Sequence, residues 1–284
     1  MLGYSRQVYY RAKRRRIKWQ ELAKKVLVLV DTIRLQMPRL GAKKLYHLLH
    51  APLRALGVGR DKLLQILRAN HLLIKPKRSY HITTNSHHRF RKHKNLIENQ
   101  TPQRPEEIWV SDITYVGNRK NPLYLALVTD AYSKKIMGYD LSESLATQGV
   151  IHALKMAYKQ RAYPDKKLIH HSDRGLQYCS DEYQELLKDF KLTCSMTESY
   201  DPYANAVAER INGILKQEFI GYKNTNPIKV MKKLIQNSIS IYNNYRPHYS
   251  CLMNTPAQMH KQCKIKIRTY RKKRSSQLVL TASP

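Results

Sequence analysis

Three acidic residues in separate short motifs have the chemistry of a divalent-metal site. Carboxylate oxygens are the ligands that hard cations such as Mg²⁺ prefer, and no Cys or His ligand set is needed. Two such ions about 4 Å apart can activate the attacking oxygen and stabilise the leaving oxygen of a phosphodiester. The acids therefore predict a site that cuts and joins DNA strands. The motifs are Trp109-Val-Ser-Asp112-Ile-Thr-Tyr115, His170-His-Ser-Asp173-Arg-Gly-Leu-Gln-Tyr178 and Asn205-Ala-Val-Ala-Glu209-Arg210.

The spacing of the acids indicates how they can meet. Asp173 and Glu209 have 35 residues between them, enough for a helix, a strand and the start of a second helix. We expect Asp112 to bridge the two ions, Asp173 to complete the shell of one and Glu209 that of the other. An ordinary acid at a wet strand end is the alternative for Asp112. A lone buried carboxylate is unfavourable unless a cation neutralises it.

Strand patterns are expected to carry the first two acids. Asp112 interrupts an apolar strand at 108–116, and Asp173 follows a short strand at 168–171. Gly175 permits close backbone approach there, at the carboxyl edge where ligands bind in α/β sheets. His171 would share the side of Asp173 and orient a carboxylate or contact phosphate; a packed histidine is the alternative.

The third acid lies early on a helix that we expect from about residue 204. Helical spacing places four polar residues on one face, where they could reach a metal and a phosphate together. They are Asn205, Glu209, Asn212 and Lys216. A solvated polar face, with Glu209 favoured by the helix dipole, is the alternative.

The order of strand and helix patterns predicts the fold class. We expect strands at 108–116, 123–129 and 135–141, a helix at 147–158, a strand at 168–171, a helix at 180–190, a strand at 192–195, and helices from about 204 and 228. This order fits an α/β catalytic core of the RNase H-like kind, a mixed five-stranded sheet with helices.

An all-α region is expected before this core. Apolar residues recur at helical spacing in 19–35, 43–53 and 60–70, with turn residues between them. Three helices with short turns and a basic third helix resemble a helix-turn-helix. With Leu63, Leu64 and Leu67 inward, the outward side chains suit phosphates and base edges, or form a solvated face. These candidate DNA contacts are Arg60, Lys62, Gln65 and Arg68.

The charge of the chain points to a polyanionic partner. Its formal net charge is +32 in 284 residues. Residues 1–104 carry 25 Lys and Arg against 4 acids, whereas 105–260 carry 19 against 16. DNA is the expected partner, held by basic flanks around a nearly neutral body. No window approaches the roughly 20 apolar residues of a membrane span, and no signal segment is recognisable, so we expect a cytoplasmic, nucleoid-associated protein with no membrane partner.

Composition divides the chain into four predicted segments. They are a helix-turn-helix region at 1–74, a basic linker at 75–104, the catalytic core at 105–260 and a basic tail at 261–284. The linker is expected to lie along a phosphate backbone, with a plain flexible connector as the alternative. Its basic residues are Lys75, Lys77, Arg78, Arg89, Arg91, Lys92 and Lys94. The four cysteines form no Cys-x-x-Cys pair, so neither a zinc site nor a disulfide framework is expected.

At these motifs the sequence resembles the DDE transposases of bacterial insertion sequences. The resemblance is to the retroviral-integrase-like catalytic subunit of the IS3 family, its second-frame product (OrfB), and it covers nearly the whole chain. Besides the acid motifs, it rests on Ser5-Arg-Gln-Val-Tyr9-Tyr-Arg11, Leu40-Gly-Ala-Lys-Lys-Leu45, Leu215-Lys216-Gln-Glu218, Tyr242-Asn-Asn-Tyr-Arg246-Pro-His248 and Thr255-Pro256.

The resemblance implies both a reaction and partners. The reaction is Mg²⁺- or Mn²⁺-dependent 3′-strand cleavage by water, followed by attack of the freed 3′-hydroxyl on a phosphodiester. The implied partners are the terminal inverted repeats of the element, a target duplex, further copies of the chain on paired ends, and an upstream-frame protein or fusion. Lys216 matches the family's basic position that contacts DNA near the active site, and we group Arg174 and Asn205 with it as DNA contacts. Retroviral integrases have an N-terminal Cys pair that this sequence lacks, so no zinc-binding domain is expected.

Two other functions fit the same residues. One is an RNase H-like nuclease or resolvase that cuts without joining, and the other is a non-catalytic DNA-binding regulator. Joined products from a 3′-hydroxyl end and a target duplex distinguish the first from a transposase. The acids are intact in all three motifs, which argues against an inactive regulator.

Overall fold

The structure is a computed structural model that describes residues 5–75, 93–98, 100–117, 121–197, 205–221 and 227–268. Parts of the predicted segments therefore lie outside the described residues. These parts include the tail beyond residue 268, the expected helix start at Ala204, and Lys77, Arg78, Arg89, Arg91 and Lys92 of the linker.

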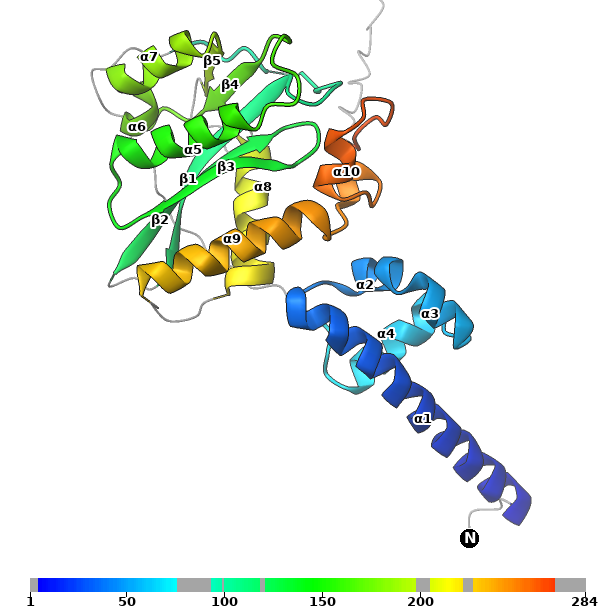
Figure 1. The fold of residues 1–284 in the computed structure, drawn as a ribbon. Helices are drawn as coiled ribbons and strands as arrows, with labels where there is room; N and C mark the ends of the chain where they lie inside the picture. Colours follow the sequence, from blue (N-terminus) through cyan, green and yellow to red (C-terminus); the bar gives the residue numbers. More distant parts are fainter. Residues whose placement is uncertain are drawn as a thin grey trace, which may run out of the picture.

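A five-stranded mixed sheet forms the centre of the core, in the order β3-β2-β1-β4-β5 (Figure 1). The strands are β1 (Ile108–Gly117), β2 (Pro122–Asp130), β3 (Ile136–Ser142), β4 (Ile169–Ser172) and β5 (Thr193–Met196). The first three pair antiparallel, whereas β4 is parallel to both β1 and β5. This mixed sheet with its helices is the RNase H-like arrangement that the sequence predicts.

Helices cover both faces of the sheet (Figure 1). One face packs against α5 (Thr147–Lys159), α6 (Leu176–Cys179) and α7 (Asp181–Asp189). The other packs against α8 (Ala206–Ile214), the π-helical turn η1 (Leu215–Ile220) and α9 (Ile228–Asn244). Alternate residues of the central strands supply the two apolar clusters, as expected for a sheet that is buried on both faces.

The N-terminal region is all-α, but it has one more helix than the periodicity predicts. Its described helices are α1 (Arg6–Gln36), α2 (Ala42–Leu48), α3 (His50–Ala55) and α4 (Arg60–Ala69). The predicted single helix at 43–53 is divided near Leu49, since Pro52 has no N–H to donate to the carbonyl of Leu48. In α4 the buried positions are Leu63, Ile66 and Leu67. Leu64 was predicted to face inward and is half-buried instead.

Part of the predicted basic linker lies beside the outer strand of the sheet. Met196 N donates to Lys94 O at 3.3 Å, and Leu96 N donates to Ser195 Oγ at 2.9 Å. Ile97 packs against an apolar cluster that includes Ile108. These contacts attach the segment 93–98 to the core.

The chain after α9 forms two short helices that the sequence analysis did not predict. They are the 3-10 turn η2 (Tyr249–Cys251) and α10 (Pro256–His260). Thr255 and Gln258 form a capping box at the start of α10, with Pro256 in its first turn. Ile265 and Ile267 pack against Tyr132, so described residues of the predicted tail also contact the core.

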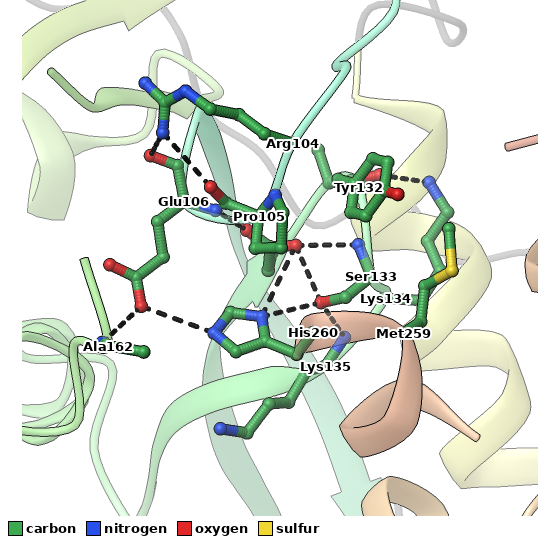
Figure 2. Close-up of polar contacts among 12 residues, drawn as sticks. Arg104, Pro105, Glu106, Tyr132, Ser133, Lys134, Lys135, Ala162, Met259 and His260 are labelled. Atoms are coloured by element: carbon green, nitrogen blue, oxygen red, sulfur yellow. Dashed lines mark hydrogen bonds and ion pairs between the residues drawn. The ribbon is translucent and has the colours of Figure 1, made fainter. Parts of the chain in front are cut away.

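A buried polar cluster holds α10 against the end of the sheet (Figure 2). His260 Nε2 lies 3.3 Å from Glu106 Oε1, and His260 Nδ1 lies 3.0 Å from Ser133 Oγ. Asp130 accepts from the backbone N of Glu106 and of Ser133, each at 2.7 Å. The Arg161 guanidinium lies 3.2 Å from Glu106. The cluster therefore joins the chain before β1, the β2–β3 turn, the loop after α5 and α10.

Electrostatics indicate that this cluster is charged. Burial opposes ionisation of Glu106, but hydrogen bonds from His260, the backbone of Ala162 and Tyr163, and Arg161 lower its pKa to about 2. Burial also opposes protonation of His260, but Asp130 and Glu106 raise its pKa above the ordinary histidine value. The two carboxylates therefore favour a histidinium between them over a wider pH range than for an ordinary histidine.

Two further features are the state of the cysteines and the character of the helices. Cys179, Cys194, Cys251 and Cys263 are all free thiols. In the part of the chain that the structure describes, no helix combines the length and the apolar character needed to cross a membrane.

Candidate active site

Asp112 lies within the central strand of the sheet. Its β1 position pairs with Leu127 of β2, and its half-buried carboxylate accepts a hydrogen bond from Asn212 Nδ2 at 2.6 Å. Asn212 is itself buried on α8. Its other amide atom, Oδ1, has no hydrogen-bond partner among the described residues. Asn212 therefore orients the Asp112 carboxylate through Nδ2 and leaves Oδ1 available as a hydrogen-bond acceptor.

Asp173 follows β4 at the carboxyl edge of the sheet, as predicted. Parallel pairing sets Val110 opposite His171, so Asp112 and Asp173 each stand two residues further along neighbouring strands. Asp173 Oδ1 accepts from Gly175 N at 3.1 Å and closes a tight turn. A Cβ at Gly175 would lie 3.1 Å from that same oxygen, which explains why the smallest residue suits this position.

Glu209 is the exposed acid of the three and stands in the first turn of α8. Asn212 follows it on the same helix, and half-buried Lys216 follows in η1. The predicted polar face thus reaches Asp112: Asn212 by a hydrogen bond, and Glu209 and Lys216 through their charges.

The three carboxylates share one electrostatic environment. Burial, and then the charges of Asp173 and Glu209, raise the pKa of Asp112 to about 8, against the hydrogen bonds of Asn212 and the Ile113 backbone. Burial raises the pKa of Glu209 as well. Burial lowers the pKa of Lys216, while the charge of Asp112 opposes that change. Carboxylates that disfavour each other's ionisation are a setting that a bound cation would relieve.

The donor set suits a hard cation in its chemistry. It consists of carboxylate oxygens with the unpartnered Oδ1 of Asn212 close by. Within the described ranges, however, no group of three or more His, Cys, Asp or Glu side chains is gathered closely enough to hold a metal ion. The three acids would therefore have to move closer together when a cation binds.

The predicted DNA contacts of the N-terminal region lie on α4. Arg60, Gln65 and Arg68 are exposed, and half-buried Lys62 places Nζ 5.7 Å from the centre of the Trp19 ring. Arg60 also pairs with exposed Asp61 at 2.9 Å. The outward face that the periodicity predicts is present, with Lys62 drawn partly onto the helical bundle.

Two other predicted site residues face inward. Asn205 is buried, and its Nδ2 donates to Ser111 O at 2.9 Å, which ties the start of α8 to β1. His171 is fully buried, with Nδ1 2.9 Å from Ser195 Oγ of β5, so the packed alternative describes it. Arg174 is half-buried directly after Asp173.

Tyr178 interacts with the charges of two of the acids, and the sequence analysis did not single it out. It is buried on α6, and its hydroxyl has no hydrogen-bond partner in the described part of the chain. Burial, then the neighbouring Tyr183 and the charges of Asp112 and Asp173, raise the pKa of Tyr178 well above its usual range. Its place at the end of the Asp173 motif was the available signal.

Family comparisons agree with this arrangement. Residues 102–202 match one model of the integrase core domain, and residues 191–256 match a second. The catalytic core domain of HTLV-2 integrase, solved in complex with magnesium, aligns with a TM-score of 0.42 at 20% identity over 55% of this chain and 97% of that one. The RNase H-like sheet and the integrase core place the protein in the class of DDE-type transposases and integrases.

Sequence relatives define the family more closely. A 31 kDa protein of insertion element IS600 from Shigella sonnei is 36% identical over 69% of this chain and 72% of that protein. Transposase InsF of IS3fB from Escherichia coli K12 is 33% identical over 69% and 68%. The putative transposase of IS986/IS6110 from Mycobacterium tuberculosis is 39% identical over 42% and 44%. The chain belongs to the family of integrase-like insertion-sequence transposases.

Proposed function

We propose that this protein cleaves and joins DNA strands at the ends of an insertion sequence, with Asp112, Asp173 and Glu209 as its catalytic, metal-binding carboxylates. The observation that carries the proposal is their electrostatic coupling. Burial, and then the charges of Asp173 after β4 and Glu209 on α8, raise the pKa of Asp112 to about 8. Carboxylates that are buried and repel one another are unfavourable by themselves, and a bound cation would neutralise their charge.

The three acids would hold two Mg²⁺ or Mn²⁺ ions, the number that phosphodiester chemistry favours. Such ions, when bound, activate the attacking oxygen and neutralise the charge on the leaving oxygen. Asn212 keeps the Asp112 carboxylate in one orientation through its 2.6 Å hydrogen bond. Glu209 is exposed on α8, so its side chain can turn toward the other two acids.

Cations around these acids would position the DNA. Lys216 lies near enough to Asp112 to interact with its charge, so it is placed to contact a phosphate beside the reacting bond. Arg174, half-buried next to Asp173, is proposed for the same strand. Arg60, Lys62, Gln65 and Arg68 would bind the terminal repeats through α4, away from the chemistry.

Substitution of each acid tests the proposal. In Asp112→Asn, Asp173→Asn and Glu209→Gln, cleavage of a duplex carrying an element end, and joining of a 3′-hydroxyl end to a target duplex, should fall at least about a thousandfold. DNA binding should persist, as measured by gel shift with Ca²⁺ present. Asp140→Asn is the matched control, because Asp140 is a half-buried acid on β3 of the same sheet.

Two results would contradict the proposal. If Asp112→Asn cleaved as well as Asp140→Asn, the carboxylate assignment would be wrong. If the wild-type protein cut the duplex but never produced joined strands, the protein would be a nuclease or resolvase.

Assembly and location are also proposed. Strand transfer at two paired ends requires two active sites, so we propose a homo-oligomer on DNA. An upstream-frame protein or fusion is proposed as a further partner. The formal charge of +32 supports residence with DNA, in the cytoplasm at the nucleoid.

A further inference from the structure

Three family-like motifs far apart in the sequence meet in one ion-pair network. Glu218 of η1 accepts two hydrogen bonds from Arg246, at 2.7 Å from Nε and 2.6 Å from Nη2. Lys44 of α2 donates to the same carboxylate at 3.1 Å. Arg246 is 1% exposed, and its guanidinium also lies 5.6 Å from the centre of the Tyr242 ring. Lys44 belongs to the N-terminal region, whereas the other residues belong to the core.

Apolar packing accompanies the network at the same place. Phe219, next to Glu218, packs against the apolar cluster of the N-terminal helices and against the cluster beneath α8 and α9. Ile241 of α9 also packs against the N-terminal cluster. The contact between the two regions therefore has an apolar part and a charged part, and η1 contributes a residue to each.

The helix that makes this contact is continuous with the helix that carries Glu209. α8 ends at Ile214 and η1 begins at Leu215. The π-helical turn closes with Gly221 N donating to Lys216 O at 2.9 Å. Such turns are rare and occur mostly at functional sites. Here the wider turn carries both Lys216, which interacts with Asp112, and Glu218, which binds the N-terminal region.

We propose that Glu218 is a positioning residue for strand cleavage, which with Arg246 and Lys44 locks the N-terminal helices onto the helix that carries Glu209 and Lys216. The proposal rests on the proposed function of that site. Arg246 binds Glu218 within the core. Lys44 makes the contact from the N-terminal region, so its removal leaves only the apolar part of the contact between the two regions, while the buried Arg246–Glu218 pair stays intact.

The Lys44–Glu218–Arg246 network, here called the lock, would keep DNA bound at α4 in a fixed position relative to the active site. A duplex end bound by the N-terminal region can reach the carboxylates in a fixed geometry only if the two regions keep a fixed relation. Misplacement of a reacting group by about 1 Å can lower a rate by about a hundredfold. Loss of the Lys44 contact should therefore reduce cleavage more than it reduces stability.

The decisive variants are Lys44→Met and Lys43→Met. Lys43 is exposed on the same helix, so its substitution removes the same charge from the adjacent position without the contact to Glu218. We expect Lys44→Met to cleave an element-end duplex about tenfold or more slowly than Lys43→Met. Lys44→Arg should retain most activity, because it keeps a cation within reach of Glu218. The unfolding temperatures of all three should agree within a few degrees, because a partly exposed ion pair contributes little to stability.

A second measurement reports on the lock without activity. Fluorophores at positions 11 and 188, both exposed, report the distance between α1 and α7. Lys44→Met should broaden the distance distribution relative to Lys43→Met. Glu218→Gln should broaden it further if that variant folds, because both cations lose their anion.

Three results would overturn the inference. They are equal cleavage by Lys44→Met and Lys43→Met, unchanged distances in Lys44→Met, or a loss of activity that follows a comparable loss of folded protein. Failure of the proposed function is seen separately, as retained cleavage in Asp112→Asn. Because the distance measurement needs no cleavage, it tests the lock in either case.

Discussion

At the scale of the single residue, Asp112 combines two opposed features. It stands in the central strand, paired with Leu127 of β2 and two residues beyond the last β1–β4 pair at Val110, and its carboxylate interacts with the charges of two other acids. Asn212 offers it one hydrogen bond, which does not compensate for burial and repulsion. In the metal-free protein the Asp112 carboxyl group therefore retains its proton well above the ordinary range.

This retained proton predicts how stability depends on pH. The pKa of Asp112 is about 8 in the folded protein, against roughly 3.9 for an unfolded aspartate. Its contribution to stability is therefore fully present below about pH 4 and is lost as the pH rises through 8. Asp112→Asn does not titrate. In EDTA, its unfolding temperature should exceed that of the wild type at pH 8 and approach it at pH 5.

Thermal unfolding followed between pH 5 and 9 measures this difference. Saturating Mg²⁺ should raise the unfolding temperature of the wild type more than that of the variant, because the cation replaces the proton. A constant offset between the two proteins at every pH would show that Asp112 does not titrate as described.

At the scale of elements, α10 depends on a charged histidine. His260 has a raised pKa, so its contribution to stability is fully present below about pH 6.5 and is lost as the pH rises through the folded value. His260→Gln should destabilise the protein by about 3 kcal/mol at pH 6, because the buried Glu106 and Asp130 then lose the imidazolium between them and Glu106 keeps only its ion pair with Arg161. The loss should be smaller at pH 9.

Urea unfolding at both pH values measures this loss. His152→Gln is the control, because the side chain of His152 is 61% exposed and lies 3.9 Å from Asp140. An equal loss for His260→Gln at pH 6 and pH 9 would mean that the imidazolium charge does not stabilise α10.

Alanine substitutions at two glycines near the contact of α5 with β3 should have opposite effects on stability. A Cβ at Gly138 would lie 2.0 Å from Ala153 O, whereas a Cβ at Gly149 meets its nearest atom at 3.6 Å. Gly138→Ala should destabilise the protein by about 1–3 kcal/mol through overpacking. Gly149→Ala, within α5, should stabilise it by up to about 1 kcal/mol. Equal effects of the two substitutions in urea unfolding would show that the strand and helix separate easily.

The sequence predicted elements well where local pattern decides them. Every strand of the sheet was expected within two residues of its observed ends, since apolar and β-branched residues mark strands that are buried on both faces. Elements shaped by one residue or by distant contacts were missed. Pro52 divides the second predicted helix, and the π-helical turn at 215–220 has the same apolar spacing as an α-helix. α10 is too short to show a period.

At the scale of the whole molecule, the basic face of α4 predicts how DNA binding depends on salt. Replacement of exposed Arg60 and Arg68 by Gln should reduce the slope of log affinity against log salt concentration by about 2 for an element-end duplex, since each arginine would release about one counterion. Lys155→Gln with Lys159→Gln, exposed on α5, is the control pair and should leave the slope nearly unchanged.

Fluorescence anisotropy at several salt concentrations measures both slopes. A larger reduction of the slope for the α5 pair than for the α4 pair would show that the DNA-binding surface lies on the core and not on the N-terminal helices.

The sequence also limits what can be predicted at this scale. The three acids were identified because each stands in its own distinctive motif. Their partners could not be identified in the same way: Asn212 meets Asp112 across 100 residues, His260 meets Glu106 across 154, and Lys44 meets Glu218 across 174. No periodic signal marks such pairs, since they depend on how separate elements pack together.

The central position of β1 has a consequence for the order in which the protein is made. A ribosome delivers Asp112 with the first three strands, which follow one another in the sequence and pair with their sequence neighbours. Asp173 arrives after the α5 crossover, and Glu209 and Lys216 arrive with α8 and η1, near the end of the sheet-forming chain. A nascent or truncated chain that stops before α8 contains all five strands but lacks the third carboxylate. The complete set of acids is therefore present only after every strand of the sheet has been synthesised.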